Sequence, residues 1–397
     1  MTVFIHLPDA VLHAIQVLNA AGFEAYAVGG CVRDSLFGKT PEDWDITTSA
    51  TPAELQIVFG AYHTVETGLR HGTLTVLVDD MPLEITTYRV DGDYSDGRHP
   101  DAVVFTRSLA EDLKRRDFTV NAMAYHPESG LVDLYGGQAD LAAGVIRCVG
   151  TPAVRFGEDA LRILRALRFA SVLGFSIDSD TAESLVELSP NLCCVSVERI
   201  AAEFKKLLCG KDAVDILSAY RSVISAFLPE VNGCDDFTSL SRMRLIPYAR
   251  FAALFFGSDV SAESAESVLR RLRLDTKTIR NVALLLTYPP RSIHTEKVYL
   301  LRLLNRLGVD LVYDYLALHE ADDATVACVD QLLKEGACYQ ISMLDIAGDD
   351  IIRLGVNAGP DVGRILQELL DAVMDGVCVN RNADLLDYVT KNKKPVQ

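Results

Sequence analysis

The stretch Ala27–Thr51, AVGGCVRDSLFGKTPEDWDITTSAT, combines a glycine pair, a basic residue and two closely spaced carboxylates within one supersecondary unit. Gly29 and Gly30 follow an expected strand over residues 24–28, and the lack of a Cβ lets a ligand approach the backbone closely. Arg33 follows at the start of an expected helix, where amide groups and a guanidinium together favour a phosphate. This order of residues predicts a phosphate-binding turn between strand and helix.

Two aspartates, Asp43 and Asp45, flank Trp44 at the end of this stretch. If residues 43–47 are extended, the strand period of two puts both carboxylates on one face. Adjacent carboxylates repel one another unless a cation lies between them, so the pair indicates Mg²⁺. Together with the glycine turn, it predicts a nucleoside triphosphate held over metal ions. Glu84, on a neighbouring expected strand, is either a third carboxylate of this site or an ordinary polar strand residue.

The bulk composition indicates a globular protein of several domains. The chain has 397 residues, of which 49% are hydrophobic and 23% charged, enough for two to four domains with ample cores. No signal peptide and no apolar run of membrane-spanning length is read from the sequence. The nine cysteines are scattered without a C-x-x-C pattern, which argues against a zinc site or a disulfide framework. We therefore expect a cytoplasmic protein with no membrane association.

The formal net charge of −17, taken alone, argues against a polyanionic partner. Charge is unevenly distributed, however, because the segment from Arg270 to Gly308 carries nine basic residues opposed only by Asp275 and Glu296. Such a basic segment is compatible with RNA contact or with a solvated helix face.

The pattern of apolar residues changes near residue 150. Before it, short strand-like runs alternate with helices, and Asp79-Asp80 is an expected hairpin turn between residues 73–78 and 81–87. After it, beginning with an expected helix over residues 156–173, the periodicity is almost entirely helical. We therefore predict an α+β protein, with an N-terminal mixed sheet followed by an all-α remainder.

Two later motifs carry polar residues with plausible ligand roles. In the first, Arg116 is a candidate contact for the phosphates or ribose of a nucleotide, with Asp117 and Asn121 orienting it by hydrogen bonds. A helix-capping role explains this run equally well.

The second motif, EDALRILRALR over residues 158–168, contains Asp159 and Arg162, which are neighbours if both lie on one helix. An intrahelical salt bridge is the simplest interpretation. A base-reading pair is the alternative, because a carboxylate accepts from an exocyclic amine while a guanidinium donates to a ring nitrogen. Cytosine and adenine share that pattern, whereas guanine and uracil reverse it and would leave polar groups unpaired. Arg165 and Arg168 continue the row toward phosphate or an RNA backbone.

Five stretches in order, GGCVRDSLFGKTPEDWDITT, RRDFTVNAMAY, VDLYGGQADL, EDALRILRALRF and SVERIAAEF, resemble the motifs of bacterial CCA-adding tRNA nucleotidyltransferases. These form the class II branch of the DNA polymerase β-like nucleotidyltransferases, which includes bacterial poly(A) polymerases. The resemblance is close over residues 1–210. It implies a catalytic head (1–150), a neck that recognises bases (151–215), a body (216–308) and a tail that contacts tRNA (309–397).

The resemblance also implies an activity: addition of C, C and A to the tRNA 3′ end from CTP and ATP, without a nucleic-acid template and with Mg²⁺. By motif position, Gly30 and Arg33 resemble phosphate contacts, and Asp43 and Asp45 resemble metal ligands. Arg116 resembles a nucleotide contact. The neck residues with the expected base- and nucleotide-recognition role are Asp159, Arg162, Arg165 and Arg168. The flexible loop that helps to switch from C to A addition in such enzymes corresponds to residues 91–100, with Asp91, Tyr94, Asp96 and Arg98.

Other functions remain open at this point. A poly(A) polymerase or an enzyme that adds only A would share every catalytic motif, and a non-catalytic RNA-binding protein could retain the fold. A P-loop kinase is excluded because the sequence has no G-x-x-x-x-G-K-[ST] motif. For partners we expect the 3′ end and elbow of tRNA, together with ATP and CTP. The sequence leaves the oligomeric state open between monomer and homodimer.

Overall fold

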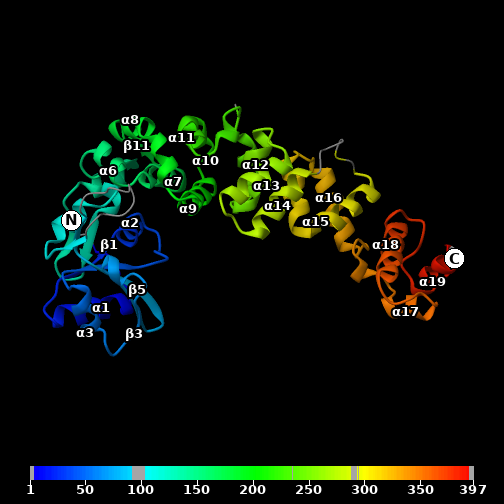
Figure 1. Cartoon of the computed structure of the whole chain (residues 1–397), viewed down its shortest axis with the longest axis horizontal. Coiled ribbons are helices and arrows are strands. Elements are labelled where there is room, and N and C mark those ends of the chain that lie inside the picture. Colours follow the sequence, from blue (N-terminus) through cyan, green and yellow to red (C-terminus); the bar gives the residue numbers. More distant parts are fainter. Residues whose placement is uncertain (1–3, 92–102, 235, 288–292, 294, 393–397) are drawn as a thin grey trace. The chain divides into compact units, whose positions relative to one another are not determined.

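A computed structural model of the chain (Figure 1) describes residues 4–91, 103–234, 236–287, 293 and 295–392. The chain divides into two compact units, one formed by Met1–Phe237 with Arg271–Leu274 and the other by Thr238–Arg270 with Asp275–Gln397. The predicted α+β class is confirmed, since a mixed sheet precedes an all-helical region. Among the described residues, no helix has the length and apolar character needed to span a membrane.

The first unit is built on a seven-stranded mixed sheet with the strand order β3-β4-β5-β2-β1-β8-β9. Its strands are β1 (Ala25–Val28), β2 (Asp45–Thr48), β3 (His63–Val65), β4 (Thr73–Val78), β5 (Met81–Thr87), β8 (Met123–His126) and β9 (Gly130–Asp133). Strand β2 pairs antiparallel with β1 and parallel with β5, and the second pairing puts Asp45 opposite Glu84. Two small sheets pair β6 (Arg89–Asp91) with β7 (Val103–Phe105), and β10 (Val145–Ile146) with β11 (Ser176–Ile177).

Alternation of apolar and polar residues fixes which face of the sheet is buried. On β4 and β5, Leu74, Val76, Leu83 and Ile85 are fully buried on the face toward helices α1 (Asp9–Ala20) and α3 (Pro52–Val58). The intervening residues, among them Glu84 and Thr86, project from the opposite face with Asp45 and Thr47 of β2. This opposite face therefore gathers the polar groups of the site.

The expected hairpin turn at Asp79-Asp80 is confirmed. Asp79 and Asp80 have positive φ angles of 47° and 63°, as a two-residue hairpin turn requires. Helix α3 begins with a capping box, in which the Thr51 side chain accepts from the backbone of Glu54 and the Glu54 carboxylate accepts from the backbone of Thr51.

The remaining helices of the first unit lie between the strands in sequence or follow the last strand of the sheet. They are α2 (Gly30–Leu36), α4 (Leu109–Lys114), α5 (Gly137–Ala143), α6 (Pro152–Glu158), α7 (Leu161–Leu173), α8 (Ser179–Glu187), α9 (Val197–Leu208), α10 (Ala213–Ala219) and α11 (Arg221–Ser225), with 3₁₀ turns η1 (Leu69–His71), η2 (Thr119–Asn121), η3 (Ser189–Cys194) and η4 (Pro229–Val231). Helix α7 packs against α9 and α10 through fully buried residues that include Leu164, Leu167, Phe204 and Leu207.

After Phe237, every regular element of the described residues is helical. These elements are η5 (Thr238–Arg242), α12 (Pro247–Gly257), α13 (Ala262–Arg271), α14 (Thr276–Thr287), α15 (Lys297–Leu318), α16 (Asp323–Lys334), η6 (Ile341–Met343), α17 (Gly348–Arg353), α18 (Pro360–Met374) and α19 (Asn382–Asn392). Successive helices pack on one another, α12 on α14, α14 on α15, α15 on α16 and α17 on α18. Helix α15 is interrupted at Gly308, whose φ of 74° and ψ of 172° are not helical.

Candidate nucleotide and metal site

The glycine pair forms a sharp turn from β1 into α2. Gly29 has a φ of 82°, a conformation that glycine adopts without strain, and its amide donates to the Met123 carbonyl at 3.1 Å. A Cβ at Gly29 would lie 2.9 Å from Nη1 of Arg116. Glycine is therefore needed for both the backbone angle and the close approach of the Arg116 guanidinium.

Arg33 lies within α2 and is 8% exposed. Its guanidinium donates to Asn121 Oδ1 at 2.6 Å and to both oxygens of Asp34 at 2.9 Å, and it lies 5.1 Å from the centre of the Phe169 ring. Asn121 in turn donates to Asp117 Oδ1 at 3.3 Å. Asn121 and Asp117 thus link the glycine turn to later parts of the site instead of bonding through their side chains to Arg116.

Asp43 and Asp45 are both exposed residues, and Trp44 between them is buried at 6% exposure. Strand β2 begins at Asp45, two residues later than expected, and Asp43 lies in a bend before it. Exposed and buried residues still alternate from Asp43 to Ile46 as in an extended segment. Burial raises the pKa of Asp45, the charge of Arg116 opposes that shift, and the nearby charges of Glu84 and Asp43 add to it. Crowded carboxylates of this kind are stabilised by a cation.

The donor set suits a hard divalent cation, because carboxylate oxygens are its preferred protein ligands. Within the part of the chain that the structure describes, no three His, Cys, Asp or Glu side chains are grouped closely enough to hold a metal ion. Two carboxylates with an open remainder fit Mg²⁺, which commonly keeps several waters and binds through substrate phosphates as well.

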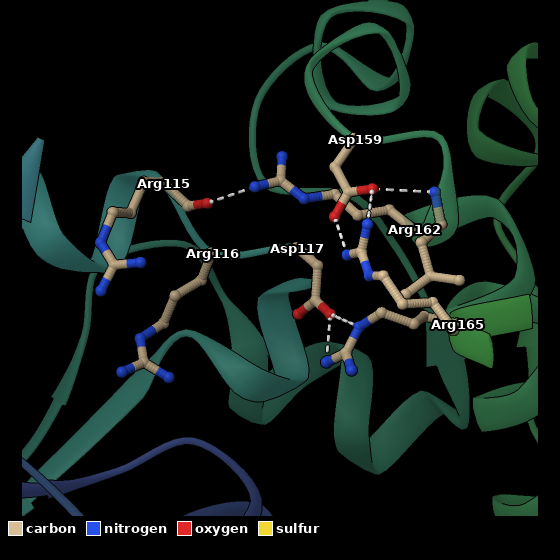
Figure 2. Close-up of a pocket in the computed structure, with 8 residues that line it drawn as sticks. Arg115, Arg116, Asp117, Asp159, Arg162 and Arg165 are labelled. Carbon is tan, nitrogen blue, oxygen red and sulfur yellow. Dashed lines mark hydrogen bonds and ion pairs between the residues drawn. The ribbon is translucent and has the colours of Figure 1, made fainter. Parts of the chain in front are cut away.

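The Arg115-Arg116-Asp117 run follows α4 and separates two cavities. One cavity, of about 290 Å³, is lined by Arg115, Arg116, Asp117, Asp159, Leu161, Arg162, Arg165 and Arg199 (Figure 2). The other, of about 200 Å³, is lined by Val28, Asp45, Ile46, Thr73, Glu84, Thr86, Arg89, Arg115 and Arg116. Arg115 and Arg116 line both, so a ligand spanning the two cavities would contact these two arginines throughout.

Asp117 is the buried anion of the larger cavity. Its Oδ2 accepts from Arg165 Nε at 2.7 Å, and Figure 2 shows the two side chains pointing toward one another. Burial alone would raise the pKa of Asp117, but the charges of Arg165 and Arg162 outweigh it and lower the pKa to about 2. Asp117 is therefore ionised at neutral pH and neutralises part of the arginine charge of the cavity.

Asp159 and Arg162 lie in this cavity, but the single helix expected over residues 156–173 is broken between them. Helix α6 ends at Glu158 and α7 starts at Leu161, leaving Asp159 extended with φ −146° and ψ 104°. Asp159 Oδ1 accepts at 3.0 Å from the amide of Leu161, the first residue of α7. Arg162 pairs with Glu158 at 2.5 Å. The simple Asp159–Arg162 salt bridge is therefore wrong, because each side chain has another partner.

Three side chains near the cavity were not identified from the sequence. Arg199 of α9 pairs with Asp159 at 2.6 Å, and Glu203 of the same helix pairs with Arg168 at 2.6 Å and Arg165 at 3.5 Å. Asp112 of α4 pairs with Arg115 at 2.7 Å. The signal for Asp112 was its place three and four residues before two arginines on a helix. Arg199 and Glu203 lie in the SVERIAAEF stretch, but no local pattern predicts their pairing, since their partners lie about 35 to 40 residues earlier in the chain.

The loop residues fall at the edge of the described structure. Asp91 is the last residue of β6, and Tyr94, Asp96 and Arg98 lie outside the described residues.

Comparison with known proteins covers most of the chain. Three family models match: "Poly A polymerase head domain" over residues 25–147, "Probable RNA and SrmB- binding site of polymerase A" over 174–232, and "tRNA nucleotidyltransferase domain 2 putative" over 249–389. The chain is 38% identical over 401 residues to a CCA-adding enzyme of Leuconostoc mesenteroides, covering 97% of each protein. It is 36% identical over 390 residues to a CCA-adding enzyme of Bacillus velezensis, covering 95% of this chain and 96% of the relative.

Solved structures agree with the sequence relatives. The CCA-adding enzyme of Bacillus stearothermophilus in complex with CTP is 31% identical, with a TM-score of 0.80 and coverage of 96% of both chains. The Thermotoga maritima CCA-adding enzyme complexed with tRNA is 22% identical, with a TM-score of 0.67 and coverage of 96% of this chain and 94% of that one. The second likeness shows a shared fold.

Proposed function

This chain belongs to the family of CCA-adding enzymes, and we propose that it adds C, C and A to the 3′ end of tRNA, using CTP and ATP and no nucleic-acid template. The observation that carries the proposal is the likeness to CCA-adding enzymes along almost the whole length of both proteins. The arrangement of the site supports it, because two exposed aspartates, a glycine turn and an arginine-lined cavity lie in one unit of the fold.

We propose that Asp43 and Asp45 hold Mg²⁺. Glu84, opposite Asp45 in the sheet, is a candidate third carboxylate that would have to move toward the pair to join it, since the three side chains are not grouped closely enough in this structure. The ion, when bound, supplies charge stabilisation for transfer of the α-phosphate to a tRNA 3′-OH, with release of pyrophosphate. The protein positions these two carboxylates through Trp44, which lies between them and packs into the core where β2 begins.

The nucleotide is proposed to lie along the surface from the glycine turn to the larger cavity. Its contacts would come from residues of the turn, of the run after α4 and of α7, namely Gly29, Gly30, Arg33, Arg116, Asp117, Asn121, Arg165 and Arg168. Asp159 and Arg162 both line the cavity and would present an acceptor and a donor, the pair that matches cytosine and adenine. The loop with Asp91, Tyr94, Asp96 and Arg98 is proposed to assist the change from C to A addition.

The proposed division of labour has four parts: head 1–150, neck 151–215, body 216–308 and tail 309–397, with the tail contacting the tRNA elbow. A match to a model described as a probable RNA-binding site, over residues 174–232, supports RNA contact beyond the head. We also propose that the enzyme acts in the cytoplasm, in keeping with nine cysteines that form no disulfide.

The test is to incubate the protein with tRNA lacking its last three nucleotides and with CTP alone, ATP alone or both. We expect two added nucleotides with CTP, none with ATP, and three with the mixture. A poly(A) polymerase or an A-adding enzyme would extend with ATP alone, and no extension with CTP alone would refute CCA addition. Asp45→Ala should abolish extension in both arms that contain CTP while tRNA binding persists, whereas a non-catalytic RNA-binding protein would show no extension even in the unmodified form.

A further inference from the structure

Asp112 is a fully buried carboxylate at 0% exposure, in α4 beneath the arginine run. Its Oδ1 accepts from Arg115 Nε at 2.9 Å and Nη2 at 2.7 Å, and from the Arg89 amide at 3.4 Å. Its Oδ2 accepts from the Thr47 hydroxyl at 3.0 Å and lies 3.7 Å from Arg116 Nη2. One side chain therefore joins a helix, the start of β6, strand β2 and both arginines.

The groups that Asp112 holds are those that border the site. Arg115 and Arg116 line both cavities. Thr47 lies two residues after Asp45 on the same face of β2, so the bond from Thr47 to Asp112 fixes the arginine run relative to the metal-binding strand. The partners of Asp112 lie on three segments that converge at the site, so its one charge couples all three.

The charge of Asp112 also has a specific consequence for Arg116. Burial alone would raise the pKa of Asp112, but Arg115 and Arg116 outweigh it and lower the pKa, so the carboxylate stays charged. Arg116 lines the smaller cavity together with Asp45, so the two opposite charges attract one another across it. Without the Asp112 charge on its other side, Arg116 would be drawn toward Asp45, where it would compete with a cation and leave the nucleotide side.

We propose that Asp112 is a positioning residue for nucleotide binding, which holds Arg115 and Arg116 toward the substrate and away from Asp45. The proposal rests on the proposed function only in taking a nucleoside triphosphate as the ligand. It predicts an effect common to CTP and ATP, because Asp112 supports the arginine run between the cavities and not the base-reading end of the site.

The experiment compares Asp112→Asn with the unmodified enzyme by calorimetric CTP and ATP binding, by KM and kcat for each nucleotide, and by thermal unfolding. Asn keeps the size and one acceptor while removing the charge. We expect the Kd and KM for both nucleotides to rise roughly tenfold to hundredfold, with the CTP to ATP ratio unchanged. A merely structural role would lower the melting temperature and the active fraction but leave Kd and KM of the folded enzyme unaltered, and that result would overturn the proposal.

A matched control and a second variant keep the test decisive. Asp314→Asn removes a comparably buried carboxylate, 2% exposed and paired with Arg244 and the Tyr248 hydroxyl in the second unit, and should destabilise without changing nucleotide affinity. If Asp112→Asn does not fold, Thr47→Val tests the proposal instead, since it removes one hydrogen bond to Asp112 without removing a charge. We expect its Kd for CTP to rise about threefold to tenfold, and an unchanged Kd would overturn the proposal. If the unmodified enzyme did not add CCA, the proposed function would be refuted, but the comparison of nucleotide Kd values between the variants would still test the role of Asp112.

Discussion

The Arg199 guanidinium engages both carboxylate oxygens of Asp159, Nη2 to Oδ2 at 2.6 Å and Nη1 to Oδ1 at 3.3 Å. Asp159 Oδ1 also accepts from the Leu161 amide, so Oδ2 retains the greater capacity to accept a further bond. The arginine from α9 therefore fixes the direction in which Asp159 faces the cavity. In the proposed base-reading role, an acceptor held in this way would face an exocyclic amine, and it would discriminate between bases only while it is held.

We accordingly expect Arg199→Ala to weaken base discrimination more than overall binding. With Asp159 free to rotate, the penalty for a wrong base falls, and the preference for CTP over UTP should drop about tenfold. The measurement is the ratio of kcat/KM for CTP and UTP on tRNA lacking its terminal nucleotides. Arg270→Ala, which breaks an exposed pair with Glu266 on α13, is the matched control and should leave the ratio as it is. An unaltered ratio in Arg199→Ala would remove the orienting role.

The close approach of Arg116 to Gly29 gives a prediction with an internal comparison. Gly29→Ala and Gly38→Ala both put an alanine at positive φ, 82° and 75°, and each should cost about 1 kcal/mol of stability. Only at Gly29 does the new methyl group meet Arg116, since nothing lies within 4 Å of a Cβ at Gly38. CTP affinity measured by calorimetry should therefore fall in Gly29→Ala alone. Equal affinities in the two variants would mean that Arg116 adjusts freely.

Trp44 is the only tryptophan of the chain and lies between the two proposed metal ligands. Because its ring is buried while its neighbours carry the exposed carboxylates, we expect Mg²⁺ binding to change the tryptophan fluorescence in a saturable way. A chelator should reverse the change, and Asp43→Asn with Asp45→Asn should abolish it. A signal that survives in the double variant would locate the metal elsewhere.

Short-range patterns predicted the parts of this site that lie close together in sequence. The glycine turn, the aspartate pair and the Asp79-Asp80 turn each depend on residues within a few positions, where backbone geometry decides the outcome. Pairing across the fold could not be read in this way. The register of β2 against β5, which sets Asp45 opposite Glu84, is a parallel contact between distant segments.

The break before α7 shows how a correct local signal was outweighed. Residues 156–173 have continuous helical periodicity, which predicts one helix. Asp159, just before the apolar run, leaves the helix, and its side chain accepts from the Leu161 amide instead. Once Asp159 leaves the helix, its carboxylate is within reach of Arg199 instead of Arg162. That partner, forty residues later in the chain, follows from the packing of α7 on α9 and not from local sequence.

The last prediction concerns His319, at the end of α15. The centre of its ring lies 4.4 Å from the centre of the Tyr315 ring and 4.9 Å from that of the Phe256 ring. Within the part of the chain that the structure describes, neither ring nitrogen of His319 has a hydrogen-bond partner. Burial lowers its pKa from 6.5 to about 4. The folded protein therefore favours the neutral ring, while the unfolded chain takes up a proton below pH 6.5.

Stability should consequently be flat above this range and decline as the pH falls from 6.5 toward 4. Because the ring is partly exposed, we discount the full linkage value to about 1–2 kcal/mol. Calorimetric melting between neutral pH and mildly acidic pH measures the slope, and His319→Phe keeps an aromatic ring in place while removing the titrating group. The variant should lose part of the acid sensitivity of the unmodified protein. If both proteins show the same decline, the acid sensitivity comes from other groups, such as His126, whose pKa burial also lowers.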